Sequence, residues 1–300
     1  MMRIFLLLLT TFSFLSVSAQ NVDYVRTMID SLCAPRYHGR GYVQHGDTKA
    51  AQFIVRQLEA LGSAQKPELL DFSLSVNTFP GAMLLQLDGQ ALTPGLDYII
   101  DPKSSGVDGT FEVVYFNPKW ARTSEKLFEQ VASEKFVNKF VVFEVNEDEA
   151  GYKTLLSDLY RDPLRAAGYL VLSDQKLTWS VSQSAMAPPI FHVNSSKAGK
   201  KIKAITAKVD QVLLPDYHGK NVMVSIPGTD KSEKKKVVFT AHLDHLGRMG
   251  EETYIPGAND NASGSAMMLD LFHYYLQHPM KQEVVFIWFG GEEAGLVGSK

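Results

Sequence analysis

The second half of the sequence alternates apolar segments of strand length with one helical segment. Residues 221–228 (NVMVSIPG), 236–247 (KVVFTAHLDHLG) and 283–289 (EVVFIWF) contain strands that are apolar on both faces, and residues 263–277 have helical spacing. Strands of this kind are buried between two layers of helices. We therefore expect an α/β fold with a mixed, mostly parallel sheet sandwiched by helices.

The N-terminus has the pattern of a secretory signal peptide. One arginine precedes an apolar run from Ile4 to Val17, and small residues end at Ala19. This pattern predicts cleavage after Ala19 and a secreted or periplasmic protein. The alternative is an uncleaved anchor, but the run is shorter than the roughly 20 residues of a membrane-spanning helix.

The segments before residue 221 divide into a helical part and a strand-rich part. We expect helices at 22–32 and 47–62, the second capped by Asp47. From residue 77 the sequence changes to short strands separated by Gly, Pro and Asp, with one further helix expected at 152–167. The expected domains are a signal peptide (1–19), the first part of a core domain (20–76), a strand-rich insert (77–212) and the continued core domain (213–300).

Charge and cysteine content exclude several classes of protein. A net charge of −3 and a pI near 6.2 give no basic surface for nucleic acid. The single cysteine, Cys33, cannot form an intrachain disulfide, and a zinc site built from several cysteines is excluded.

Three polar clusters stand at strand ends or helix starts in the second half. In the first, AHLDH, the alternation of strand side chains points His242 and Asp244 the same way. A metal-binding imidazole usually donates its other N–H to a carboxylate, which this pair would allow. A purely structural hydrogen-bonded pair explains the motif equally well.

The other two clusters supply carboxylates. Asp260 lies in the turn GANDNASG before a helix. Its carboxylate either has a functional role or merely caps or braces the turn. Glu292 and Glu293 follow an apolar strand and a Gly-Gly turn, with no cation beside them. Two adjacent buried carboxylates are unfavourable unless a proton or a metal neutralises one of them.

Taken together, the clusters predict a zinc site. Histidine, aspartate and glutamate are ligands that suit zinc. A site with two zinc ions needs a bridging carboxylate and a general base that takes a proton from water. Two neighbouring glutamates can divide these tasks, one as a ligand and one as the base.

The motifs AHLDHLG, GANDNASG and FGGEEAGLVGS, in this order, closely resemble the M28 family of zinc exopeptidases, of the secreted aminopeptidase type. The segments GRGYVQHGDTKAAQFIVRQLEALG and NVMVSIPG are similar to the N-terminal part of that family. The insert resembles the protease-associated domain found within many members.

The resemblance implies the zinc exopeptidase fold, peptide substrates and two Zn²⁺ ions. His242 would bind one ion, Asp260 would bridge both and Glu293 would bind the second. Glu292 would be the general base, and Asp244 would orient His242. The resemblance also implies a cis peptide bond between Asp260 and Asn261. His245 is expected at the rim of the site, not as a ligand.

Members of the family use two further ligands, an aspartate and a late histidine, which would lie beyond residue 300. We therefore expect this chain to be the N-terminal part of a longer protein whose catalytic domain continues. Two alternatives stay open. One is a transferase with a single zinc ion that resembles glutaminyl cyclase, and the other is a binding protein of the same fold without catalysis. No nucleic-acid partner and no stable membrane insertion after signal cleavage are expected.

Overall fold

The computed structural model describes residues 21–117, 124–144, 160–185, 187–199 and 201–300. The predicted signal peptide and the first part of the predicted helix 152–167 lie outside these residues. Residues 160–167 form turns, so the helix prediction is wrong for this part. Asp162 and Arg165 adopt positive φ, and the ring of Pro163 between them removes a backbone donor. No helix in the described ranges is long and apolar enough to cross a membrane.

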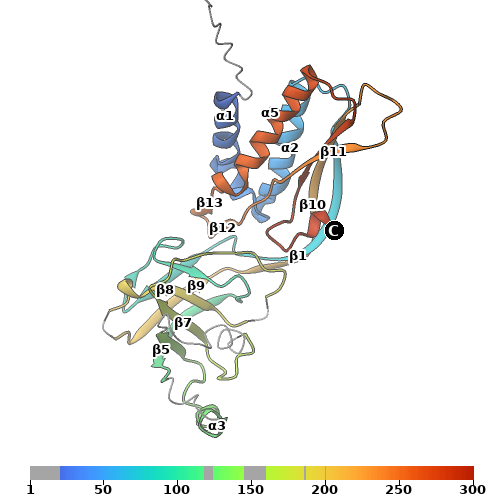
Figure 1. Cartoon of the computed structure of the whole chain (residues 1–300). Helices are drawn as coiled ribbons and strands as arrows, with labels where there is room; N and C mark the ends of the chain where they lie inside the picture. The colour runs from blue at the N-terminus through green and yellow to red at the C-terminus, as the bar shows by residue number, and fades with distance from the viewer. Residues whose placement is uncertain (1–20, 118–123, 145–159, 186, 200) are drawn as a thin grey trace, which may run out of the picture.

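A four-stranded sheet forms the centre of the first lobe, at the top of Figure 1. Its strands stand in the order β1 (Glu68–Thr78), β10 (Val212–Ile226), β14 (Glu283–Phe289) and β11 (Lys236–His242). β11 and β14 are parallel, whereas β10 is antiparallel to both β1 and β14. The expected mixed sheet is confirmed, but its pairings in the described residues are mostly antiparallel, because the chain leaves this lobe along β1 and returns beside it along β10.

Three helices lie on the same side of this sheet: α1 (Val22–Leu32), α2 (Gly46–Ala60) and α5 (Ser263–Gln277) (Figure 1). The helices α2 and α5 pack on the strands, and α1 packs against α5. Ile54 of α2 and Phe272 of α5 are fully buried in one hydrophobic cluster with Phe286 and Trp288 of β14. On the opposite face Val238 is 51% exposed, and none of the described α-helices packs there. In the described residues, α-helices therefore cover one face of the sheet, whereas the prediction placed helices on both faces.

An irregular arm connects α1 to α2, as expected. It contains two short helical turns, η1 (Pro35–Arg40) and η2 (Val43–His45). The prediction that Asp47 caps α2 is wrong, because His45 occupies the capping position. Asp47 lies in the first turn of the helix, is buried and accepts a hydrogen bond from the hydroxyl of Tyr217. Burial against β10 therefore decides the position of this carboxyl group.

Residues of the expected insert form the second lobe, with an eight-stranded sheet and two hydrophobic clusters, one of which also contains Met249 from outside the insert (Figure 1). The expected boundaries at 77 and 212 fall at the end of the β1–β10 ladder, where Thr78 pairs with Val212. Its elements are β2 (Met83–Leu87), β3 (Gln90–Ala91), β4 (Tyr98–Ile100), β5 (Val107–Tyr115), α3 (Ser124–Ala132), β6 (Phe140–Glu144), β7 (Gly168–Ser173), β8 (Ile190–Asn194), η4 (Ser195–Lys197) and β9 (Ala204–Val209).

The remaining short elements surround the end of β11. A two-stranded hairpin of β12 (Gly247–Met249) and β13 (Thr253–Ile255) follows it, and the irregular turn η5 (Ala258–Ala262) leads into α5. The turn η6 (Val297–Ser299) follows β14.

Candidate metal centre

Two parallel strands end side by side at one edge of the first sheet. His242, the last residue of β11, pairs with Phe289, the last residue of β14. The N–H of Leu243 donates to the carbonyl oxygen of Phe289 at 2.7 Å. Because parallel strands have their carboxyl ends at the same edge, the residues that follow each strand meet there.

The turn after β14 needs both of its glycines. Gly291 has a φ of +66°, which few other residues adopt. A Cβ on Gly290 would lie 2.8 Å from the carbonyl oxygen of Lys220. The side-chain oxygen of Asn221 accepts a hydrogen bond from the N–H of Gly290 at 2.9 Å. This turn aims Glu292 and Glu293 back toward the end of β11.

Asp260 approaches from the segment before α5. The peptide bond between Asp260 and Asn261 is cis, which confirms that expectation. Asp260 Oδ1 lies 3.1 Å from His242 Nε2. Gly257 precedes it with a φ of +59°, and a Cβ there would lie 2.3 Å from the ring of His245. The turn is thus packed closely against the end of β11.

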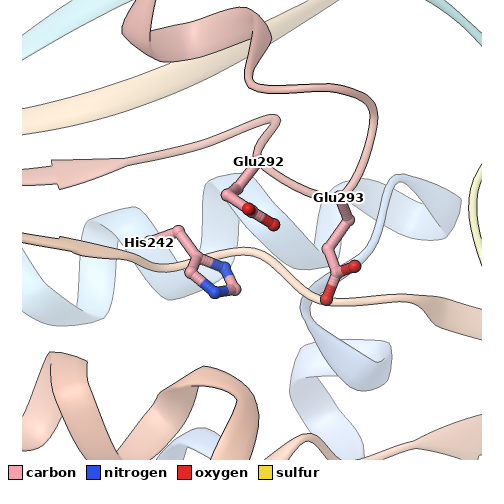
Figure 2. A group of neighbouring side chains, drawn as sticks. All are labelled: His242, Glu292 and Glu293. Carbon is pink, nitrogen blue, oxygen red and sulfur yellow. The ribbon is translucent and has the colours of Figure 1, made fainter.

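The structure brings the predicted site residues together. Figure 2 shows His242, Glu292 and Glu293 pointing toward the same space, from the end of β11 and from the turn after β14. One ligand atom from each of these residues lies within 4.8 Å of the others. The residues come from segments about 50 positions apart, so only the parallel pairing of the two strands makes them neighbours.

His245 lies among the candidate metal ligands, whereas the sequence analysis placed it at the rim of the site. It is buried, and its Nδ1 is 2.6 Å from Glu293 Oε1. The alternation of strand side chains does not reach this residue because β11 ends at His242. His245 and Asp260 form a second group with Glu293 whose ligand atoms lie within 4.8 Å of one another.

Asp244 is fully buried beneath the two glutamates. Its carboxylate accepts hydrogen bonds from the backbone N–H groups of Glu292 and Glu293, each at 3.2 Å. The hydroxyl of Tyr42 donates to the same carboxylate at 3.4 Å. The nearest Asp244 carboxylate oxygen is 3.7 Å from His242 Nδ1, and the Asp244 carbonyl oxygen is closer, at 3.2 Å. The carboxylate therefore holds the backbone of the glutamate pair.

The carboxylates make the site strongly negative. Burial by itself lowers the pKa of His242, but the nearby carboxylates, Asp244 foremost, raise it to about 9. Burial raises the pKa of Glu292, the charge of His242 opposes this change, and the neighbouring carboxylate of Glu293 adds to it. Crowded anions of this kind favour the binding of a cation.

The donor atoms fit zinc. Imidazole nitrogen and carboxylate oxygen are common zinc ligands, and the two groups described above share Glu293. Asp260 contacts His242 through Oδ1 and also belongs to the group that contains Glu293. One carboxylate thus lies within reach of both groups, which is the arrangement that a pair of metal ions requires.

Comparison with known proteins relates the C-terminal part of the given sequence to a family of peptidases. Residues 221–300 match the model of Peptidase family M28. Aminopeptidase YwaD of Bacillus subtilis is 34% identical over 103 residues, which are 34% of this chain and 19% of that protein. A probable leucine aminopeptidase of Trichophyton verrucosum is 32% identical over 112 residues, 35% of this chain and 27% of that protein.

Solved structures are similar over most of the chain. An aminopeptidase from Aneurinibacillus sp. strain AM-1 has a TM-score of 0.59 and 21% identity, and the match covers 94% of this chain and 65% of that one. BSAP, a zinc aminopeptidase from Bacillus subtilis, has a TM-score of 0.65 and 18% identity, covering 92% and 63%. The chain thus spans less than two thirds of these relatives, and the likeness concerns the fold.

The family match covers the part of the molecule that carries the site. The five predicted site residues, from His242 to Glu293, all lie within residues 221–300. This part of the chain therefore resembles Peptidase family M28 in sequence, and the described chain has a mixed α/β fold similar to that of zinc aminopeptidases.

Proposed function

We propose that the protein is a zinc-dependent exopeptidase that hydrolyses the first peptide bond of a peptide and releases the N-terminal residue. The observation that carries this proposal is the pair Glu292 and Glu293, aimed at the strand end where His242 lies. One carboxylate of such a pair can bind metal while its neighbour handles a proton. The M28 match and the aminopeptidase relatives support the same class of reaction.

In this proposal His242, Asp260 and Glu293 would hold zinc, and Asp260 would serve both groups of ligand atoms. The 3.1 Å contact of Asp260 with His242, and its proximity to Glu293, support the bridging position. His245 contacts Glu293 and restricts the orientation of its carboxylate. Asp244 acts on the backbone, because it accepts the N–H groups of both glutamates.

The chemistry is hydrolysis by an activated water. Bound zinc supplies Lewis acidity, which polarises the peptide carbonyl group and makes water easier to deprotonate. Glu292 takes a proton from the water that attacks the carbonyl carbon, and then delivers it to the amine nitrogen that leaves.

Substitution of Glu292 by Gln tests the assignment of the base. Glutamine keeps the size of the side chain but cannot accept the proton, so we expect turnover of a peptide substrate to fall by about 10²–10⁴-fold. Zinc content, measured on the complete gene product by metal analysis, should stay at two ions per chain. Glu251→Gln, in the exposed turn between β12 and β13, is the matched control and should change neither quantity.

Wild-type turnover in Glu292→Gln would show that Glu292 is not the base. A protein that contains one zinc ion and cyclises an N-terminal glutamine would contradict the peptidase activity itself. The protease-associated character of residues 77–212 stays a prediction. Secretion after cleavage at Ala19 also stays a prediction, which N-terminal sequencing of the mature protein would check.

A further inference from the structure

Arg40 is a fully buried cation in the arm between α1 and α2. Its side chain has no exposed surface, although arginine is almost never fully buried without compensating contacts. Its backbone φ is +52°, a left-handed conformation that is uncommon for residues other than glycine. Such a conformation persists where the surrounding structure enforces it, and it is frequent near functional sites.

The guanidinium group of Arg40 binds two loops of the candidate metal centre. Its Nε donates to the carbonyl oxygen of Leu243 at 2.9 Å, next to Asp244. Its two terminal nitrogens each donate twice, so each of the five N–H groups has an acceptor. These acceptors are the carbonyl oxygens of Leu32 (3.3 Å), Pro256 (2.6 Å), Gly257 (2.8 Å) and Asp260 (3.4 Å).

The backbone of Arg40 contributes a further contact. Its carbonyl oxygen accepts a hydrogen bond from the N–H of His245 at 3.1 Å. The side chain and the main chain of one residue therefore hold the chain on both sides of Asp244, at Leu243 and at His245. The same side chain reaches the loop that ends at Asp260.

Glycines on both sides of Arg40 allow this close approach. A Cβ on Gly39 would lie 2.4 Å from the carbonyl oxygen of Gly247, and one on Gly41 would lie 2.4 Å from the Cα of Gly247. The arm therefore packs backbone against backbone on the segment that follows His245. Any side chain larger than hydrogen at these two positions would push Arg40 away from the loops.

We propose that Arg40 is a positioning residue, which holds the loop 243–245 and the loop 256–260 at the separation that metal binding requires. This inference rests on the proposed function, because it takes His242 and Asp260 as ligands. The buried positive charge also faces the negative charges of Asp244 and Asp260. Arg40 thus acts through the backbone of the ligand loops and touches neither the metal nor the substrate.

Two substitutions separate the charge of Arg40 from its geometry. Arg40→Lys keeps the positive charge but has three donors without the planar fork, so it cannot reach both loops together. Arg40→Gln keeps an amide donor and loses the charge. Removal of contacts that orient metal ligands typically weakens metal binding by about 10–100-fold. We expect the zinc dissociation constant to rise about 10-fold in Arg40→Lys and about 100-fold in Arg40→Gln.

The experiment measures zinc affinity by chelator competition on the complete gene product. The visible absorption spectrum of the Co²⁺-substituted protein reports the geometry of the ligands without any turnover. Leu58→Ala is the control, because Leu58 is fully buried in α2 and contacts the helical core. This variant should lose thermal stability but keep the wild-type zinc affinity and Co²⁺ spectrum. If Arg40→Gln does not fold, Arg40→Lys decides the outcome.

The possible outcomes distinguish this inference from the proposed function. Wild-type zinc affinity and an unchanged Co²⁺ spectrum in a folded Arg40 variant would overturn the positioning role, whatever the turnover. Weakened zinc binding in both variants, with a wild type that cleaves no peptide, would support the positioning role and contradict the peptidase activity. A wild-type protein without affinity for zinc would contradict both.

Discussion

Asp47 shows, at the scale of single residues, how burial changes the chemistry of a carboxyl group. It lies inside α2, and the hydroxyl of Tyr217 donates a hydrogen bond to it. Burial raises the pKa of Asp47 to about 7, although hydrogen bonds from Tyr217 and Thr48 partly oppose this change. The charge of Asp244 adds to the rise, so Asp47 and the site are coupled electrostatically.

Asp47 should make the stability of the protein depend on pH. The folded state holds the proton up to about pH 7, whereas the unfolded chain loses it near pH 3.8. The contribution of Asp47 to the free energy of unfolding is therefore largest below about pH 4, and it falls as the pH rises to about 7. We compare the free energy of unfolding of the wild type with that of Asp47→Asn. The wild-type value minus the variant value should fall by at most about 4 kcal/mol between about pH 4 and pH 7.

Urea unfolding of both proteins at several pH values measures this difference. Asparagine keeps an acceptor for Tyr217, so the comparison removes the titration and retains the hydrogen bond. Other titratable groups are common to both proteins and cancel. Parallel pH profiles would contradict the raised pKa.

At the scale of elements, the contact between α5 and β14 sets the orientation of the site. Phe272 of α5 packs edge-on against Phe286 of β14, with ring centres 5.5 Å apart. Trp288 donates from Nε1 to the carbonyl oxygen of Ser265, at the start of the same helix, at 3.1 Å. Asp260 precedes α5 and the two glutamates follow β14, so this contact positions one group relative to the other.

Phe272→Ala should weaken this contact and leave a cavity. Removal of a fully buried phenylalanine typically lowers the free energy of unfolding by about 3–5 kcal/mol. Denaturant unfolding measures the loss. Tyr274→Ala is the control on the same helix, where the side chain is 42% exposed, and it should cost about 1 kcal/mol or less. Equal losses in the two variants would contradict the importance of this contact.

At the scale of the whole molecule, two strands connect the two lobes, and a hydrogen bond joins the lobes beside the candidate site. β1 and β10 connect the lobes (Figure 1). Gln183, from the insert, donates from Nε2 to the carbonyl oxygen of Ala294 at 2.7 Å. Val181 packs beside it on a small cluster that includes Tyr42 and Ala294. The insert thus supports the turn that carries Glu292 and Glu293.

Gln183→Leu should reduce activity without disrupting the fold. The substitution removes one hydrogen bond, worth about 1 kcal/mol, which corresponds to about a fivefold lower kcat/KM if the turn must be held in place. Steady-state kinetics with a peptide substrate measures this ratio. Gln90→Leu, in the exposed strand β3, is the control and should leave kcat/KM unchanged. Equal kcat/KM in both variants would show that the insert does not support the turn.

Short-range patterns in the sequence by themselves determined most of the elements and the clusters of polar residues. Helix α1 has the predicted bounds, because apolar spacing and the start of a helix depend on neighbouring residues. The motifs that contain His242, Glu292 and Glu293 could also be read from the sequence, whereas the parallel pairing of β11 with β14 brings them together. The strand-rich character of the insert followed from the same local patterns.

Contacts between distant segments decided the rest. The antiparallel pairing of β1 with β10, the burial of Asp47 and the position of His245 all depend on residues remote in sequence. Arg40 is the clearest case, because its acceptors are carbonyl groups from Leu32 to Asp260, which have no signature in the sequence. Every residue has a carbonyl group, so only the tertiary structure decides which of them a buried cation will bind.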